Sequence, residues 1–309
     1  MIINWQPNPG PQTEFTERRE FEVLYGGAAR GGKSDALLGE AGRYIDYPDY
    51  RAIMFRRTYP QLSQGGGLID RSRAIYGGIG EYFSTARKWK FPSGAEIQFA
   101  HLDRDADVYD YQGGAYSYIG FDEATHFTEF QIRYMYSRCV SNSPHYPARI
   151  RYGTNPGNVG HLFFKERFVN CGAYNSVLDP VSGHHRVYIP ARVYDNPYYN
   201  PDSDKCVDPN YIYTLMMLPE DQRRMLLEGD WDIFIGQFFN EWRELVHVVK
   251  PFSIPDGWLM GFGIDYGLHD PFCWLEGALD LRESPTLYIT NEYYEAEVTP
   301  QENAREVVR

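Results

Sequence analysis

The sequence of 309 residues predicts an α/β domain with a mainly parallel sheet, followed by the beginning of a second domain. Short apolar strands alternate with helical segments over roughly the first 230 residues, and a glycine-rich loop joins the first strand to the first helix. A stretch with two prolines then precedes a fresh apolar strand at 259–265. We therefore expect the first domain at 1–230, a connector at 231–258 and an incomplete second domain at 259–309.

The chain begins with a largely polar segment. Its first 20 residues contain Pro7, Pro9 and Pro11, which predicts an irregular lead-in. The short apolar run 21–25 then predicts a strand. Residues 33–45 carry apolar side chains at helical spacing, so we expect a helix directly after the glycine-rich loop.

The later elements follow from the same two patterns, apolar runs and helical periodicity. Apolar or alternating runs predict strands at 51–55, 96–100, 116–121, 148–152 and 186–189. Helical periodicity predicts helices at 129–138, 161–168, 211–217 and 220–227. In the second domain, strands are expected at 259–265, 275–279 and 287–293, with a helix over 300–308.

The charge balance limits how the protein can contact nucleic acid. The chain has 30 Lys and Arg against 42 Asp and Glu, a net charge of −12. A protein that wraps nucleic acid over a whole face is normally basic. Any contact with DNA is therefore expected to be local, or to be shared by several subunits around a ring.

Cysteine usage and hydropathy exclude several classes of protein. The four cysteines, Cys139, Cys171, Cys206 and Cys273, have no CxxC spacing, so we expect reduced thiols rather than disulfides or a zinc site. No apolar run approaches the roughly 20 residues of a membrane span. The amino terminus lacks the features of a signal peptide. We expect a soluble, intracellular protein.

The strongest motif fits the phosphate-binding pattern G-x-x-x-x-G-K-[ST] between a strand and a helix: Gly27-Ala28-Ala29-Arg30-Gly31-Gly32-Lys33-Ser34. Its glycines, Gly27, Gly31 and Gly32, let backbone N–H groups approach phosphate oxygens without a side-chain clash. The amino end of the following helix adds partial positive charge. Lys33 is expected to reach the β- and γ-phosphates of ATP, and Ser34 to bind Mg²⁺. The sequence therefore predicts a P-loop NTPase.

A second motif supplies acids to the same reaction. The apolar strand at 118–121 ends in Asp122 and Glu123. Asp122 is expected to hold Mg²⁺ through water, and Glu123 to polarise the attacking water as general base. An acid pair after a strand is a weak signal alone, but it strengthens with a P-loop about 90 residues upstream. A base directly beside the metal ligand predicts the ASCE (RecA-like) class rather than a kinase-type P-loop protein.

A third motif follows the strand at 148–152. Thr154 and Asn155 stand at the carboxyl end of that strand, where parallel sheets bind their ligands. They are expected to sense the γ-phosphate and to pass its loss on to the rest of the molecule. The alternative is an Asn-Pro-Gly turn over 155–157 that has no functional role.

Other residues near the motifs have two interpretations each. Arg30, inside the glycine loop, either lies over the γ-phosphate and acts in catalysis or is solvated. The amide of Gln12 can read the edge of adenine, although a Gln in a polar lead-in is usually solvated. Arg56 and Arg57, which follow the strand at 51–55, either contact phosphate, in the same chain or across a subunit interface, or cap the end of the strand. Arg104 and Arg138 are further candidates for an arginine supplied to a neighbouring subunit.

The strand at 259–265 delivers Asp265 to an edge, followed by Gly267 and, nearby, Asp270. Two-metal nucleases place their first carboxylate in this way. An aspartate in a tight turn explains the same residues equally well. Asp265 is therefore a candidate ligand of a nuclease metal, Mg²⁺ or Mn²⁺.

Taken in order, these motifs resemble those of the large terminase subunits of tailed bacteriophages, over nearly the whole chain. Gln12 matches the family's adenine motif, residues 27–34 its Walker A motif and 118–123 its Walker B motif. Residues 154–156 match its coupling motif, and Asp265 matches the first acid of its RNase H-like nuclease domain.

Two further stretches, 195–197 and 227–231, also resemble segments of that family. The opening Gly26-Gly27-Ala28-Ala29 of the glycine loop is unusual for it, although the fixed positions of the motif agree. The later nuclease acids are expected beyond Arg309, so this chain is expected to lack a complete nuclease metal site.

The resemblance implies a motor that hydrolyses ATP with Mg²⁺ and moves double-stranded viral DNA into a procapsid. It also implies a nuclease that cuts the DNA concatemer. The implied partners are a portal protein, a small terminase subunit and further copies in a ring of five, in the cytoplasm of the infected cell. No membrane partner is expected.

Two rival functions use the same ATPase motifs. A helicase-like translocase is one, but it would normally have a second RecA-like domain where the 259–265 strand stands. A nucleotide-dependent switch or scaffold with little turnover is the other, and its hydrolysis rate should not respond to duplex DNA.

Overall fold

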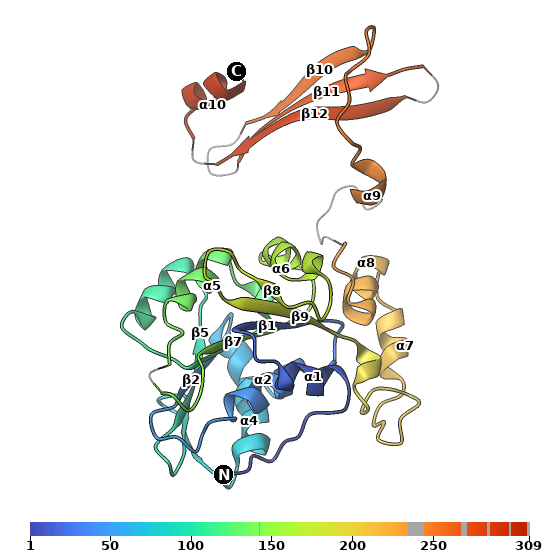
Figure 1. Cartoon of the computed structure of the whole chain (residues 1–309). Helices are drawn as coiled ribbons and strands as arrows, with labels where there is room; N and C mark the ends of the chain where they lie inside the picture. Colours follow the sequence, from blue (N-terminus) through green and yellow to red (C-terminus); the bar gives the residue numbers. More distant parts are fainter. Residues whose placement is uncertain (142, 234–243, 267–270, 283–284, 297, 308–309) are drawn as a thin grey trace. The chain divides into compact units, whose positions relative to one another are not determined.

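The computed structural model describes the chain except for residues 142, 234–243, 267–270, 283–284, 297 and 308–309. It divides the chain into two compact units, Met1–Asn240 and Glu241–Arg309. Figure 1 traces both units along the chain.

The first unit is built on one nine-stranded sheet, in the order β3-β4-β5-β2-β6-β7-β1-β9-β8. The strands from β5 to β9 in this order run parallel to one another. They are β5 (Glu96–His101), β2 (Arg51–Arg56), β6 (Tyr118–Asp122), β7 (Arg149–Thr154), β1 (Glu22–Gly27) and β9 (His185–Ala191). The short strands β3 (Glu81–Phe83), β4 (Lys88–Lys90) and β8 (Val177–Leu178) pair antiparallel at the two ends of the sheet. The predicted α/β class with a mainly parallel sheet is confirmed.

Helices cover both faces of this sheet. The α-helices are α1 (Pro11–Glu17), α2 (Lys33–Ala41), α3 (Tyr59–Ser63), α4 (Leu68–Tyr76), α5 (Glu129–Tyr136), α6 (His161–Arg167), α7 (Tyr211–Met216) and α8 (Glu220–Arg223). A π-helical turn, Arg224–Glu228, continues α8. Short 3-10 helices lie at Asp105–Tyr111, Ala124–His126, Val169–Cys171 and Val193–Asp195.

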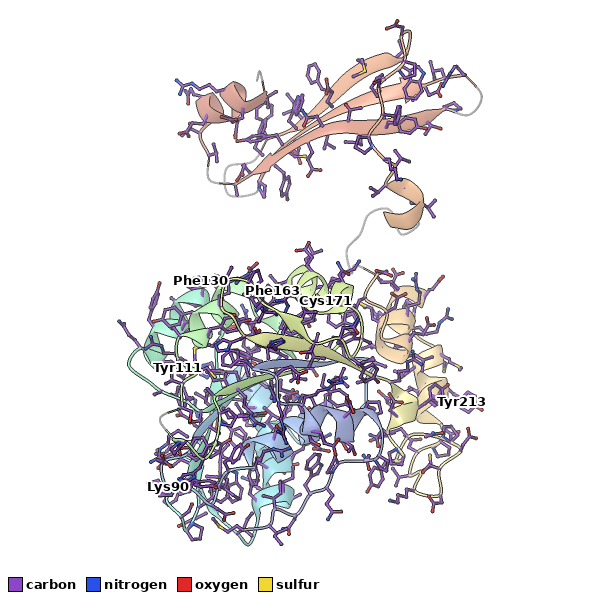
Figure 2. All side chains as sticks on the ribbon, in the orientation of Figure 1. Lys90, Tyr111, Phe130, Phe163, Cys171 and Tyr213 are labelled. Atoms are coloured by element: carbon purple, nitrogen blue, oxygen red, sulfur yellow. The ribbon has the colours of Figure 1, made fainter. Side chains whose placement is uncertain are left out.

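Alternation along each strand creates two hydrophobic cores. In β1, Val23 and Tyr25 face the core that α1, α2 and α4 complete, while Leu24 faces the core beside α5 and α6. All residues of β1 are buried, as expected for a parallel strand covered on both faces. Figure 2 shows side chains filling these two layers, with Tyr213 of α7 at the outer edge.

The expected irregular lead-in is wrong in part, because residues 11–17 form α1. Pro11 occupies the first turn of the helix, where its missing N–H costs nothing. Phe15 is fully buried and stacks on Tyr25 with ring centroids 5.1 Å apart, so tertiary packing stabilises this short helix. The helix expected at 33–45 ends earlier, at Ala41, and Gly42 caps it.

The second unit contains a three-stranded antiparallel sheet, β10 (Leu259–Asp265), β11 (Phe272–Asp280) and β12 (Thr286–Glu295). The helices α9 (Glu244–His247) and α10 (Pro300–Val307) complete its described elements. The three strands predicted here are present, two of them longer than expected. Within the described part of the chain, no helix has the length and apolar character of a membrane span.

Candidate functional site

The predicted motifs meet at the carboxyl ends of three neighbouring strands. β1 leads into the glycine loop, β6 ends in Asp122, and β7 ends in Thr154. The carboxyl ends of parallel strands are where such sheets bind ligands. A cavity of about 430 Å³ lies there. Its lining includes Arg30, Gly31, Gly32, Lys33, Ser34, Arg56, Arg71, Glu123, Asn155, Asn196, Tyr199 and Tyr211.

The glycine loop has a backbone that side chains would disrupt. Gly27 and Gly32 have φ angles of 135° and 76°, in the region that favours glycine. A Cβ on Gly27 would lie 2.4 Å from the carbonyl oxygen of Ala191. A Cβ on Gly32 would lie 2.5 Å from Nε2 of Gln12. Both positions therefore favour glycine for its backbone conformation, and Gly27 requires it for space as well.

Neighbouring segments fix the first half of the loop. The N–H of Ala28 donates to the carbonyl of Ala191 (2.7 Å), and the N–H of Ala29 donates to the carbonyl of Leu226 (2.6 Å). The hydroxyl of Tyr25 donates to the carbonyl of Gly31 (2.8 Å). Because these groups hold the loop in place, phosphate-binding amides are expected later, at the amino end of α2.

Lys33 points across the site toward the third motif. Its Nζ donates to the carbonyl of Ala28 (2.5 Å) and to Oδ1 of Asn155 (2.7 Å). The side chain is buried, and this burial lowers the pKa of Lys33 to about 8, against the opposing effect of Glu123 and Asp122. The ammonium group thus already links the glycine loop to the carboxyl end of β7.

Asp122 lies between a hydroxyl and a guanidinium. The hydroxyl of Ser34 donates to Oδ1 of Asp122 (3.0 Å) and lies 3.1 Å from Oδ2. Nε of Arg56 donates to Oδ2 of Asp122 (2.8 Å), and the two side chains form an ion pair. Asp122 is only 1% exposed, so Arg56 supplies the charge that a buried carboxylate needs.

Glu123 occupies a strained backbone position beside these groups. Its φ of 54° is left-handed, which is uncommon for a residue with a side chain and recurs at functional sites. Burial and the neighbouring Asp122 raise the pKa of Glu123, while Lys33 and Arg56 lower it. A carboxylate with a raised pKa is a better proton acceptor near neutral pH.

Thr154 and Asn155 connect the site to the turn that follows Glu123. The hydroxyl of Thr154, which is fully buried, accepts from the N–H of Thr125 (3.0 Å). The hydroxyl of Thr125 donates to the carbonyl of Asn155 (3.0 Å). The segments after β6 and β7 are therefore hydrogen-bonded to each other, and the second of them contacts Lys33 through Asn155.

Two predicted residues have surroundings that sequence reasoning missed. The guanidinium of Arg30 lies 5.4 Å from the ring centroids of both Tyr199 and Tyr211. Gln12 does not line the cavity: Nε2 donates to the carbonyl of Gly32 (2.8 Å), and Oε1 accepts from the N–H of Asn8 (2.7 Å). In this structure Gln12 supports the glycine loop, and base recognition by its amide stays a prediction.

The remaining candidates are not among the residues that line the cavity. Arg57 donates to the carbonyl of His126 (3.0 Å), whereas Arg104 is exposed and Arg138 is half-buried. Asp265 is exposed at the end of β10 in the second unit, and Asp270 lies outside the described residues. Within the described residues, no group of three or more His, Cys, Asp or Glu is placed to hold a metal ion by itself.

The site also contains residues that were not singled out for a role. Nδ2 of Asn196 donates to the carbonyl of Arg30 (2.7 Å), which ties the 195–197 segment to the loop. Nη1 of Arg71 donates to Oδ1 of Asp35 (2.8 Å) at the first turn of α2. The resemblance of 195–197 to a known family was the signal for Asn196, while Arg71 carries no motif.

A known protein family and several solved structures are similar to this chain. Residues 24–166 match the family model described as terminase large subunit, T4likevirus-type, N-terminal. No curated protein sequence matches the chain.

Solved structures resemble this chain over most of its length. The large terminase of a thermophilic bacteriophage superposes with a TM-score of 0.58 and 16% identity, over 98% of this chain and 73% of that one. The complex of that same terminase with ATP-gamma-S gives a TM-score of 0.55 and 15% identity, with the same coverage. The large terminase of the HK97 bacteriophage superposes with a TM-score of 0.52 and 11% identity, over 94% of this chain and 63% of that one. At these identities the likeness shows the fold.

Proposed function

We propose that the chain is the large subunit of a viral DNA-packaging terminase, since its residues 24–166 match the amino-terminal model of that family. Its first unit hydrolyses ATP to drive double-stranded viral DNA into the procapsid. One observation carries this proposal: the neighbouring residues Lys33 and Ser34 meet a second neighbouring pair, Asp122 and Glu123, at one end of the sheet beside a cavity of about 430 Å³.

The residues present suit ATP with Mg²⁺. Mg²⁺ is commonly bound by one or two carboxylates together with substrate phosphates, and it prefers oxygen ligands. Ser34 and Asp122 offer a hydroxyl and a carboxylate 3.0 Å apart, so they would hold the ion together with the nucleotide. When bound, the ion would neutralise charge on the phosphate oxygens.

The chemistry of hydrolysis then falls to Glu123. Its carboxylate accepts a proton from water as the water oxygen forms a bond to the γ-phosphorus, while the bond from that phosphorus to the β–γ bridging oxygen breaks. Lys33 and the amides at the start of α2 hold the phosphates. Arg30, which lines the cavity, adds positive charge on the solvent side.

Thr154 and Asn155 are proposed to report the state of the nucleotide. Asn155 accepts from the same Lys33 ammonium that would contact the γ-phosphate, so a movement of Lys33 toward the phosphate would weaken its bond to Asn155. Loss of the phosphate returns Lys33 to Asn155, and the bonded Thr125–Thr154 pair carries the change to the turn after β6.

The wider assembly is also proposed from the family. The relatives from the thermophilic bacteriophage and from HK97 are large terminases by name, and we propose the family's partners for this chain: double-stranded DNA, a portal protein, a small terminase subunit and further copies in a ring of five. It would act in the cytoplasm of the infected cell. The second unit would begin an RNase H-like nuclease that uses Mg²⁺ or Mn²⁺, with Asp265 as its first ligand.

Steady-state ATP hydrolysis with and without duplex DNA tests this function. We expect Glu123→Gln to bind ATP and to lose nearly all turnover, because the proton acceptor is gone. Glu129→Gln is the matched control, since Glu129 is an exposed glutamate on α5 that pairs with Arg133. Undiminished hydrolysis by Glu123→Gln removes that residue from its role, and a rate that ignores duplex DNA favours a nucleotide switch.

A further inference from the structure

The first residue of α6, His161, lies between the nucleotide site and the segment that leads out of the first unit. It is 2% exposed and follows the Asn155 loop directly in the sequence. The N–H of Gly157 donates to Nδ1 of His161 (2.8 Å). Nε2 of the same ring lies 3.0 Å from the carbonyl oxygen of Trp231.

These contacts determine the tautomer of the ring. A backbone N–H can only donate, so Nδ1 of His161 must be the unprotonated, accepting nitrogen. Nε2 therefore carries the proton and donates it to the carbonyl of Trp231. Burial lowers the pKa of His161, which keeps the ring neutral and this pattern intact.

On one side, His161 is joined to the residues that contact Lys33. Gly157 belongs to the loop that begins with Asn155, whose Oδ1 accepts from Lys33. Gly160, directly before His161, donates its N–H to the carbonyl of Thr125 (2.8 Å). A shift of Asn155 therefore reaches the first turn of α6 through a short, continuous chain of contacts.

On the other side, Trp231 packs against the strand that carries the glycine loop. Its indole N–H donates to the hydroxyl of Tyr188 (3.2 Å), and its ring is the nearest neighbour that a Cβ on Gly26 would meet, at 3.2 Å. Trp231 is 5% exposed, and the described part of the first unit ends two residues later, at Ile233.

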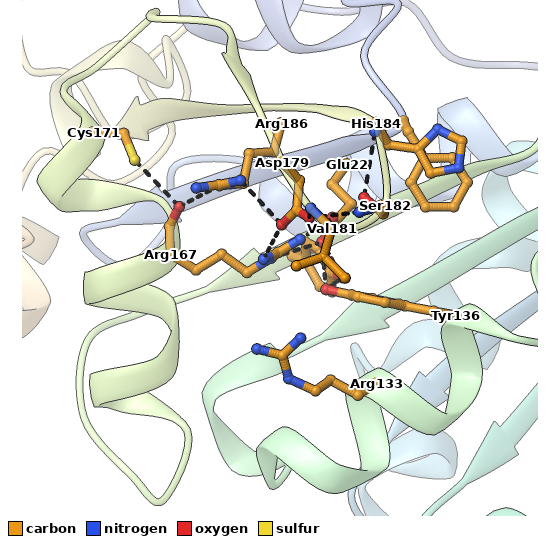
Figure 3. Close-up of polar contacts among 12 residues, drawn as sticks. Glu22, Arg133, Tyr136, Arg167, Cys171, Asp179, Val181, Ser182, His184 and Arg186 are labelled. Atoms are coloured by element: carbon orange, nitrogen blue, oxygen red, sulfur yellow. Dashed lines mark hydrogen bonds and ion pairs between the residues drawn. The ribbon is translucent and has the colours of Figure 1, made fainter.

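The other end of α6 is fixed in place. Nη2 of Arg167, the last residue of α6, donates to Oε1 of Glu22 (2.6 Å), and Nη1 donates to Oδ2 of Asp179 (2.7 Å), as Figure 3 shows. The hydroxyl of Tyr152 donates to Oε2 of Glu22 (3.0 Å). Because this end is held by buried charges at the amino end of β1, a displacement of the Asn155 loop acts on the His161 end of α6.

We propose that His161 is a positioning residue. Through its two hydrogen bonds, to Gly157 and to Trp231, it couples the nucleotide site to the segment 226–233, which contains Trp231. The proposal rests on the nucleotide site proposed above. It assigns no contact between His161 and the nucleotide. Both ring nitrogens are needed, because each one holds a different partner.

Hydrogen–deuterium exchange of peptides covering 226–233, in the full chain with and without ATPγS and Mg²⁺, tests this coupling. In the unmodified chain we expect the nucleotide to change exchange there at least about threefold. His161→Asn keeps an acceptor near Gly157 but does not reach Trp231, and His161→Gln reaches Trp231 but leaves Gly157 without its acceptor. Both variants should bind ATPγS and lose the change. The control is His185→Gln, at the exposed start of β9.

A second measurement needs no substitution. NMR of histidine labelled with ¹⁵N should show His161 protonated at Nε2 only, with resonances that shift when ATPγS and Mg²⁺ are added, while those of His185 stay in place. A full exchange response in either His161 variant, or a His161 ring unaffected by bound nucleotide, overturns the coupling role. Absence of nucleotide binding by the unmodified chain would instead overturn the proposed function.

Discussion

At the scale of single residues, Lys33 makes nucleotide binding sensitive to pH. Its pKa is lowered to about 8 by burial, so the ammonium of the nucleotide-free protein is lost as the pH rises through that value. Phosphate attracts the charged form, hence the dissociation constant of ATPγS should increase above pH 8 by up to about tenfold per pH unit. Calorimetric titration from pH 7 to 10 checks this. Lys33→Arg, which stays charged throughout, should flatten the dependence, and a flat profile in the unmodified chain contradicts it.

Arg56 should stabilise the fold through Asp122. Removing one partner of a buried ion pair leaves an uncompensated charge, which costs about 3 kcal/mol or more. We expect that cost in the free energy of unfolding of Arg56→Met, measured by urea denaturation. Arg133→Met is the matched control, because Arg133 pairs with Glu129 where both are about half exposed, and such pairs contribute less than about 1 kcal/mol. If the two variants lost equal free energy of unfolding, the buried pair of Arg56 and Asp122 would stabilise the fold no more than the exposed pair does.

The sequence predicted which side chains would come together at the ends of the parallel strands, but it said less about the other contacts that they make. Each of the three motifs follows the carboxyl end of a parallel strand, and such ends lie at one edge of the sheet. This brings together Lys33, Ser34, Asp122 and Asn155, and each motif can be recognised from its local sequence. The environments of Gln12 and Arg30 depend on distant segments, the carbonyl of Gly32 and the rings of Tyr199 and Tyr211. No local pattern specifies such contacts.

At the scale of elements, the turn from β1 into α2 depends on glycine. Gly27→Ala would place a Cβ 2.4 Å from a backbone oxygen of Ala191, at a φ of 135°. Gly78→Ala is the matched control, because Gly78 has a φ of 82° and nothing within 4 Å of its Cβ position. Both variants carry the strain of a left-handed residue, about 1–2 kcal/mol. Gly27→Ala should lose about 1–3 kcal/mol more through overpacking, and also its nucleotide binding.

Thermal or urea unfolding separates these two variants. If both variants were destabilised equally, the glycine loop would have room for a Cβ at position 27. The close approach to Ala191 would then not explain why glycine is needed there.

The elements predicted from sequence were those with a strong local pattern. Buried parallel strands read as continuous apolar runs, so β1, β2, β6, β7 and β9 were found within about two residues. The edge strands β3, β4 and β8 have only two or three residues and carry no period. α1 was missed because prolines suggested irregular chain, whereas burial of Phe15 and Gln12 stabilises it.

At the scale of the whole molecule, the charge balance bears on the proposed assembly of several copies. The net charge of −12 does not suit a chain that wraps DNA alone. Arg57, Arg104 and Arg138 lie outside the cavity lining of their own chain, so a role for any of them in hydrolysis would have to come from a neighbouring copy.

ATP hydrolysis per chain should therefore rise with protein concentration. An arginine supplied by a neighbour is worth about 10³–10⁵ in turnover where it has been measured. Removing that arginine should abolish the dependence of turnover on protein concentration without affecting nucleotide binding. The variants to test are Arg57→Ala, Arg104→Ala and Arg138→Ala, with Arg133→Ala as the control. Turnover per chain that is constant from dilute to concentrated solution contradicts a shared site.

The central claim is that the glycine loop and the acidic end of β6 hold one magnesium nucleotide between them. Calorimetric titration of the full chain with ATPγS, with Mg²⁺ and then with EDTA, tests it most directly. We predict that each chain binds one nucleotide and that its affinity for ATPγS falls when Mg²⁺ is removed. Lys33→Ala should bind ATPγS weakly. Asp122→Asn should bind it with an affinity that no longer depends on Mg²⁺. Binding that is unaffected by both substitutions would contradict the claim, because the nucleotide would then lie elsewhere.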